Sequence, residues 1–236
     1  MYLDSRGLGE AITEDTPTER VVAWTLERFA GHRMLMTTSF GMEGCALIDM
    51  YASHNVPMTI VYLDTMFFFA ETYELRDRMV ERYPHISFVN RGTTLTPREQ
   101  AEKFGDELWK DNPDLCCKLR KIDPMLEVMA DADVWITGLR RSQSAARMNL
   151  RLIEWDWRHQ VLKVSPLFKW ERSAIWAYVQ EHDVPYNKLH EQGFPTVGCT
   201  HCTVAVPGSS PADYSRNGRW KDFTKTECGL HGGAGI

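Results

Sequence analysis

The stretch HRMLMTTSFGMEGCALIDMYASHN, residues 32–55, combines the signals that decide the class of fold. It opens with a short apolar run that predicts a strand, and it ends with the spacing of an amphipathic helix. Small residues around Gly41 separate the two parts. A strand, a loop of small residues and a helix together form the repeating unit of α/β proteins.

The same order recurs along the rest of the chain. Alternating strands and helices favour a parallel sheet with helices on its faces. At 236 residues the chain is long enough for one such domain with a functional extension. The further strands are predicted within residues 57–65, 86–90, 133–139 and 160–167, and the helices within residues 16–31, 70–84, 96–109, 120–131 and 170–183.

The character of the sequence changes after Pro185. Residues 185–236 are rich in Gly, Pro, Ser and Thr and have little periodicity, yet they contain half of the cysteines. A loop-rich segment with reactive residues is either held by a metal or mobile for a functional reason. We therefore expect an α/β nucleotide-binding core over residues 1–184 and a loop-rich segment with a mobile catalytic tail over residues 185–236.

Composition excludes several classes of function. The formal net charge of −5 gives no indication of nucleic-acid binding. No apolar run is long enough to cross a bilayer, and the polar N-terminus lacks the apolar centre of a secretory signal. We expect a cytoplasmic protein, in which thiols stay reduced and a cysteine pattern indicates metal binding or catalysis.

Four of the six cysteines form two pairs. Cys116 and Cys117 are adjacent, and Cys199 and Cys202 have the two-residue gap typical of metal and cluster ligands. Zinc and an iron–sulfur cluster both suit four thiolates, and isolated buried cysteines remain the alternative. Adjacent cysteines point in different directions, which favours a cluster because it offers separate irons. Cys45 is expected in the core.

A loop with free hydroxyls and two clusters of cationic residues indicate a small, highly charged anion as ligand. The loop TTSFGMEG, residues 37–44, offers hydroxyls and free backbone N–H groups to a phosphate or sulfate, although an ordinary helix cap would look the same. Cys228 has Lys225 and His231 near it and is either a nucleophile or a stray surface thiol. Two cationic groups accompany them in this acidic chain: Arg140, Arg141 and Arg147, and Arg216, Arg219, Lys221 and Lys225.

The chain resembles the assimilatory adenylylsulfate reductases, which are relatives of the 3'-phosphoadenylylsulfate reductases within the adenine nucleotide alpha hydrolase-like group. The resemblance runs from TTSFG to the C-terminus. Its motifs are TTSFGMEG, VYLDTMFFFAETY, CCKLRK, TGLRRSQSAAR, HDVPYNKLHEQGFPTVGCTHC, NGRW and TKTECGLH.

The resemblance implies a site and a reaction. Cys116, Cys117, Cys199 and Cys202 would bind one 4Fe-4S cluster, and Cys228 would be the nucleophile that attacks adenylylsulfate and carries an S-sulfo group. Thioredoxin or glutaredoxin would then release sulfite. The implied substrate-binding residues are Thr37, Thr38, Ser39, Leu63, Lys121, Gly138, Arg140, Arg216, Arg219 and His231.

Three alternatives stay open. The enzyme would use the 3'-phosphorylated nucleotide or both nucleotides, or the chain would be a non-catalytic nucleotide-binding module with a structural zinc. We also expect a homo-oligomer, either a dimer or a tetramer, with no nucleic-acid or membrane partner.

Overall fold

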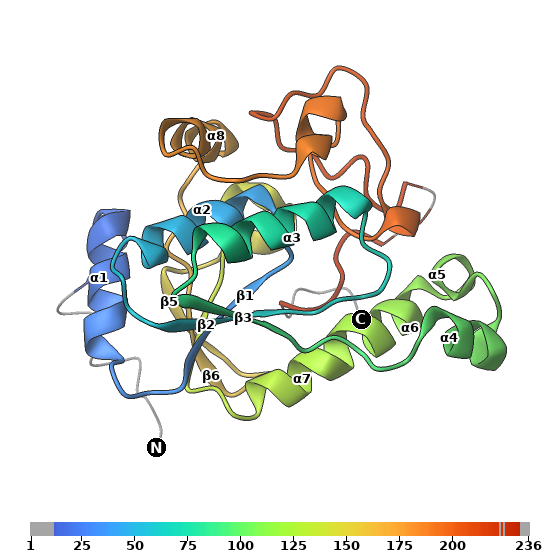
Figure 1. Ribbon diagram of the computed structural model, residues 1–236, viewed down its shortest axis with the longest axis horizontal. Helices are drawn as coiled ribbons and strands as arrows, with labels where there is room; N and C mark the ends of the chain where they lie inside the picture. The colour runs from blue at the N-terminus through green and yellow to red at the C-terminus, as the bar shows by residue number, and fades with distance from the viewer. Residues whose placement is uncertain (1–11, 222, 224, 232–236) are drawn as a thin grey trace.

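The computed structural model describes residues 12–221, 223 and 225–231, and it has a six-stranded sheet at its centre (Figure 1). The strand order is β3-β2-β1-β4-β6-β5, and every neighbouring pair is parallel except β5 and β6. The predicted α/β class with a mostly parallel sheet is therefore confirmed. The strands are β1 Met34–Thr38, β2 Met58–Tyr62, β3 Ile86–Asn90, β4 Val134–Ile136, β5 Ile153–Asp156 and β6 Val161–Val164.

Helices cover both faces of the sheet. In Figure 1, α2 and α3 lie on one side of the strands and α7 lies on the other. The largest apolar cluster packs α2 against β1 and β2 and includes Met36, Cys45 and Ile60, so Cys45 is a core residue as expected. The helices are α1 Thr18–Arg28, α2 Met42–Ala52, α3 Ala70–Arg82, α4 Pro97–Phe104, α5 Leu108–Asp111, α6 Pro113–Cys117, α7 Asp123–Met129 and α8 Arg172–Glu181.

Between β3 and β4, the helices of the structure differ from those predicted from the sequence. The single helix expected over residues 96–109 is two helices, because Gly105 adopts a φ of 92° and ends α4. The next helix begins earlier than expected, since α6 continues through a π-helical turn at Lys118–Ile122 into α7. Such turns often accompany functional sites.

The C-terminal segment lies on the core and contains little regular structure. Its short helical turns are Lys188–Gln192 and Thr200–Cys202, and single bridges join Phe68 to Cys199 and Thr203 to Arg219. The ends of the two predicted parts, residues 1–11 and 232–236, lie outside the described residues. Within the described part of the chain, no helix has both the length and the apolar character needed to span a bilayer.

Candidate active site

A cavity of about 220 Å³ opens at the carboxyl ends of β1, β2 and β4. Ligands of open α/β sheets bind at this edge. The cavity brings together predicted residues from across the chain, and Arg147 lines it as well. The predicted residues in its wall are Thr37, Thr38, Ser39, Leu63, Lys121, Gly138, Arg216, Arg219, Cys228 and His231.

The loop after β1 is shaped by its own side chains. The Thr38 hydroxyl accepts a hydrogen bond of 2.9 Å from the Phe40 backbone N–H, and Phe40 adopts a positive φ of 56°. Gly44 packs closely against this turn, because a Cβ there would lie 2.6 Å from the Thr38 hydroxyl. The N-terminus of α2 therefore faces the cavity, where helix N–H groups favour an anion.

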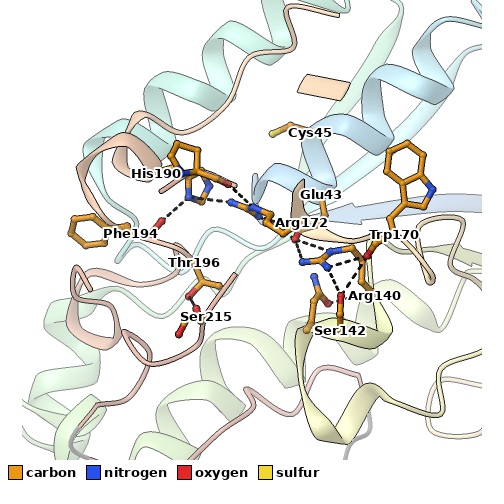
Figure 2. A network of polar contacts seen from close by, with 12 residues as sticks. Glu43, Cys45, Arg140, Ser142, Trp170, Arg172, His190, Phe194, Thr196 and Ser215 are labelled. Carbon is orange, nitrogen blue, oxygen red and sulfur yellow. Dashed lines mark hydrogen bonds and ion pairs between the residues drawn. The ribbon is translucent and has the colours of Figure 1, made fainter. Parts of the chain in front are cut away.

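A buried ion network fixes this loop to two other elements (Figure 2). Glu43, in the first turn of α2, accepts hydrogen bonds from Arg140 at 2.7 Å and from Arg172 at 3.1 Å. Burial alone would raise the pKa of Glu43, but Arg172 and Arg140 lower it to about 2. The carboxylate is therefore ionised and ties α2 to the loop after β4 and to α8.

This network gives Arg140 a place that differs from the predicted one. Its side chain is fully buried and lies behind the cavity wall, where its guanidinium contacts Glu43, Ser142 and the Trp170 carbonyl. The role predicted for Arg140 against a bound anion stays a prediction. Among the neighbouring arginines, Arg147 is the one that lines the cavity, although it was absent from the implied binding residues.

His190 lines the same end of the cavity and is almost fully buried. Its Nδ1 donates to the Phe194 carbonyl at 2.7 Å, because a carbonyl oxygen can only accept. Burial and the nearby Arg172 lower the pKa of His190 to about 4. This histidine is therefore neutral at physiological pH.

The four paired cysteines line a second, small cavity next to the first one. Cys116 and Cys117 come from α6, and Cys199 and Cys202 come from the C-terminal segment. Lys121 lines both cavities. Burial raises the pKa of the Cys116 thiol to about 12, whereas Lys121 and a contact of 3.3 Å with the Thr65 hydroxyl outweigh burial and lower the pKa of Cys199.

The residues around these thiols fit an iron–sulfur cluster. Arg120 is buried, lines the cysteine cavity and donates to Gln100 and to the Thr65 carbonyl, while its buried Nη2 has no hydrogen-bond partner among the described residues. A bound group that presents sulfur acceptors would satisfy this donor. Among the described residues, no set of three or more His, Cys, Asp or Glu side chains converges on a point that would suit a single ion.

Cys228 reaches the first cavity from the described end of the chain. We call residues 225–231 the tail; of these, Glu227, Cys228, Leu230 and His231 line the cavity. The His231 ring stacks on Trp135 with centroids 4.9 Å apart. Burial and nearby cations, Lys163 first among them, lower the pKa of His231 well below its ordinary value, so its ring is neutral.

Several side chains at the site had no signal in the sequence. Thr65 follows β2, and Trp135 in β4 donates from its indole to the Thr37 hydroxyl at 2.8 Å. Arg120 lies within the CCKLRK motif, but only the fold shows that its guanidinium enters the cysteine cavity. Arg147 did have a signal, because it ends the TGLRRSQSAAR motif and belongs to the first cationic group.

The fold and the site define an α/β protein with a cavity lined by cations at the carboxyl edge of its sheet, beside a thiol and two pairs of cysteines. Residues 33–205 match the profile of the family described as "phosphoadenosine phosphosulfate reductase domain". The chain therefore belongs to this family, and it is an oxidoreductase that acts on a sulfur group.

Similar proteins agree with this membership. The adenosine 5'-phosphosulfate reductase of Shouchella clausii (strain KSM-K16) is 43% identical over 211 residues, which cover 89% of this chain and 86% of that protein. That of Staphylococcus saprophyticus is 43% identical over 221 residues, covering 93% and 90%. The crystal structure of phosphoadenylyl-sulfate reductase from Candida auris in a phosphate complex matches with a TM-score of 0.74 and 27% identity, over 86% of this chain and 99% of that one.

Proposed function

We propose that this protein reduces adenylylsulfate to sulfite and AMP in sulfate assimilation, through an S-sulfo intermediate on Cys228. The observation that carries the proposal is one cavity in which Cys228, the loop at Ser39 and the cations Lys121 and Arg219 face each other. The names of the similar reductases support the substrate class.

The first step is a displacement at sulfur. The Cys228 thiolate attacks the sulfur of adenylylsulfate, a new S–S bond forms, and the bond from sulfur to the phosphate oxygen breaks. AMP leaves with the electron pair of that bond, and Cys228 carries the sulfonate. Covalent catalysis of this kind divides one difficult reduction into two easier steps.

The second step needs a dithiol, for which we propose thioredoxin or glutaredoxin. One of its thiolates attacks the Cys228 sulfur, and sulfite leaves with the electron pair of the S–S bond. The second thiol of the partner then attacks the mixed disulfide, which restores Cys228 and leaves the partner oxidised.

Positive charge is needed because two anions meet in the first step. Lys121 and Arg219 line the cavity wall, and the Arg219 guanidinium lies against Gly198 and stacks over Trp220 at 4.3 Å. The N-terminus of α2 adds the partial charge of its free N–H groups. Together these groups stabilise the charge that develops where the thiolate and the phosphosulfate approach each other.

Cys116, Cys117, Cys199 and Cys202 would hold the 4Fe-4S cluster. When bound, the cluster would supply a structural link between α6 and the C-terminal segment and a charge next to Lys121. No electron has to pass through it in the two displacements. Arg219 donates to the Cys202 carbonyl at 3.2 Å, so the order of this cysteine loop bears directly on an arginine of the cavity.

The choice between the two nucleotides is part of the proposal. The four cysteines and the similar adenosine 5'-phosphosulfate reductases favour adenylylsulfate, whereas the similar Candida auris structure is of a reductase for the 3'-phosphorylated nucleotide. We further propose a cytoplasmic enzyme, since its thiols must stay reduced.

The test is anaerobic turnover of the purified protein with reduced thioredoxin. We expect sulfite release from adenylylsulfate that is much faster than from the 3'-phosphorylated nucleotide, and iron and sulfide in the protein. Equal rates would indicate a dual reductase. Zinc in place of iron together with no sulfite would contradict the proposal and favour the non-catalytic nucleotide-binding module.

A further inference from the structure

The tail is held mainly by polar contacts, although it carries the nucleophile. One carboxylate oxygen of Glu227 accepts from Arg147 at 2.8 Å and lies 3.3 Å from Arg216, and its other oxygen accepts from the Ser144 hydroxyl at 2.9 Å. We call these four residues the Glu227 clamp. Glu227 directly precedes Cys228, so the clamp fixes the backbone at the nucleophile.

The clamp is enclosed. The Glu227 side chain is 9% exposed, and those of Arg147 and Arg216 are 13% and 19% exposed. Partial burial makes the attraction between the carboxylate and two guanidinium groups stronger than that of a surface pair. The Glu227 clamp is therefore a largely shielded set of charges that acts on the tail.

Packing gives the tail limited support. A third cavity of about 200 Å³ lies beyond it, and Glu227, Gly229 and His231 line this cavity together with Arg147. The first cavity lies on the other side of the same residues. The tail thus forms a partition between two cavities, with apolar and ring contacts at Leu230 and His231.

The clamp also occupies cations that face the ligand cavity. Arg216 donates from Nε and Nη2 to the Thr226 carbonyl at 3.1 and 2.7 Å, in addition to its contact with Glu227. Arg147 gives one Nη to Glu227 and the other to Gln143. Both arginines line the first cavity, so the Glu227 carboxylate shares them with any anion that binds there.

We propose that Glu227 is a positioning residue for Cys228, and that its carboxylate holds the tail closed by using the two arginines that also attract the substrate anion. This inference rests on the proposed function. It predicts opposite effects on two steps when the carboxylate is lost. Attack by Cys228 becomes slower, because the tail is released. Binding of the anion stays as strong or becomes stronger, because two cations are freed.

The test compares Glu227→Gln with the wild-type holoenzyme under anaerobic conditions. With adenylylsulfate and no reductant, we expect S-sulfo formation on Cys228 to slow by about 100-fold, the order of loss that a small misplacement of a reacting group produces. In a Cys228→Ser background, Glu227→Gln should bind adenylylsulfate as tightly as before or more tightly. Without nucleotide, iodoacetamide should label Cys228 faster in Glu227→Gln, with buried Cys45 as the unreactive internal reference.

Glu154→Gln is the matched control. Glu154 lines the third cavity and pairs with Lys163 at 3.0 Å, not with a described residue of the tail, so this variant removes the same charge close by. It should leave the rate of S-sulfo formation and the labelling of Cys228 at their wild-type values. If Glu154→Gln slowed S-sulfo formation equally, the effect would come from the loss of any nearby negative charge, and the inference would be overturned.

The outcomes separate this inference from the proposed function. If wild-type enzyme forms no S-sulfo group on Cys228, the proposed function fails. If wild-type forms the group and Glu227→Gln forms it at the same rate, only the inference fails. Weaker nucleotide binding in parallel with slower transfer would also overturn it, because a merely structural role lowers both.

Discussion

The loop at residues 37–44 and the tail at residues 225–231 face the same cavity but are held in different ways. The loop is fixed by Glu43, whose two arginine partners are 0% and 4% exposed. The tail is fixed by Arg147 and Arg216, which line the ligand cavity, and its Lys225 pairs with the exposed Asp114. A ligand-binding loop benefits from a preformed shape, whereas a nucleophile that must meet both a nucleotide and a protein reductant has to be released.

The four paired cysteines bring α6 and the C-terminal segment together beside the cavity that the loop and the tail share, so their loss should have the largest effect. Cys117→Ala should remove the iron and nearly all sulfite release together, because a closed metal site couples to local folding. Iron analysis and turnover on the same sample measure this. Full turnover by an iron-free variant would mean that the cavity keeps its arginines in place without the cluster.

The loop should depend strongly on its buried carboxylate. Glu43→Gln should lower the free energy of unfolding by about 3–5 kcal/mol, because two buried guanidinium groups lose their counter-charge. Urea titration measures this difference. A decrease of less than about 1 kcal/mol in the free energy of unfolding would show that the Glu43 ion pairs contribute no more than an ordinary surface ion pair.

The same carboxylate predicts how stability depends on pH. The pKa of Glu43 falls from its ordinary value of 4.5 to about 2 in the folded chain. Its contribution is therefore complete above about pH 4.5 and is lost as the pH falls toward 2. The difference in unfolding free energy between wild type and Glu43→Gln should shrink over this range, and a constant difference would contradict the assignment.

Gly44 tests the shape of the loop. Gly44→Ala places a Cβ 2.6 Å from the Thr38 hydroxyl, so the turn must shift. Overpacking of this kind costs about 1–3 kcal/mol. We expect a lower melting temperature and weaker nucleotide binding, measured by calorimetry. Unchanged binding would mean that the anion does not depend on this turn.

Arg158 should have the smallest effect. It donates to the Gly229 carbonyl at 2.6 Å, one contact among several that hold the tail. Arg158→Ala should cost about 0.5–1.5 kcal/mol of tail docking, which amounts to at most about a tenfold faster labelling of Cys228 by iodoacetamide. A larger change than in Glu227→Gln would reverse the order of importance that we assign to the two contacts.

Local patterns predicted the parts of the fold that depend on neighbouring residues. The apolar run and the small residues of the opening stretch placed β1, its loop and α2. The edge strand β5 was not predicted, although its residues IEWD alternate between apolar and polar, because a run of only four residues is weak evidence for a strand. Gly105 broke a predicted helix through a positive φ that the periodicity did not indicate.

The site could be predicted only where a motif carries the chemistry. The cysteine pairs and Cys228 stand out by spacing and by resemblance, and the fold brings each group to a cavity. The partner of Arg140 lies 97 residues away in sequence at Glu43, so only the fold reveals that this arginine belongs to the loop. The same applies to Glu227, whose clamp needs residues from 144, 147 and 216.

The central claim is that Cys228 takes the sulfonate while the four paired cysteines do not react. Peptide mass spectrometry after mixing the holoenzyme with adenylylsulfate, without a dithiol, tests this most directly. We predict one added sulfonate group, located on Cys228. A sulfonate on another residue, or none on any residue, would contradict the account.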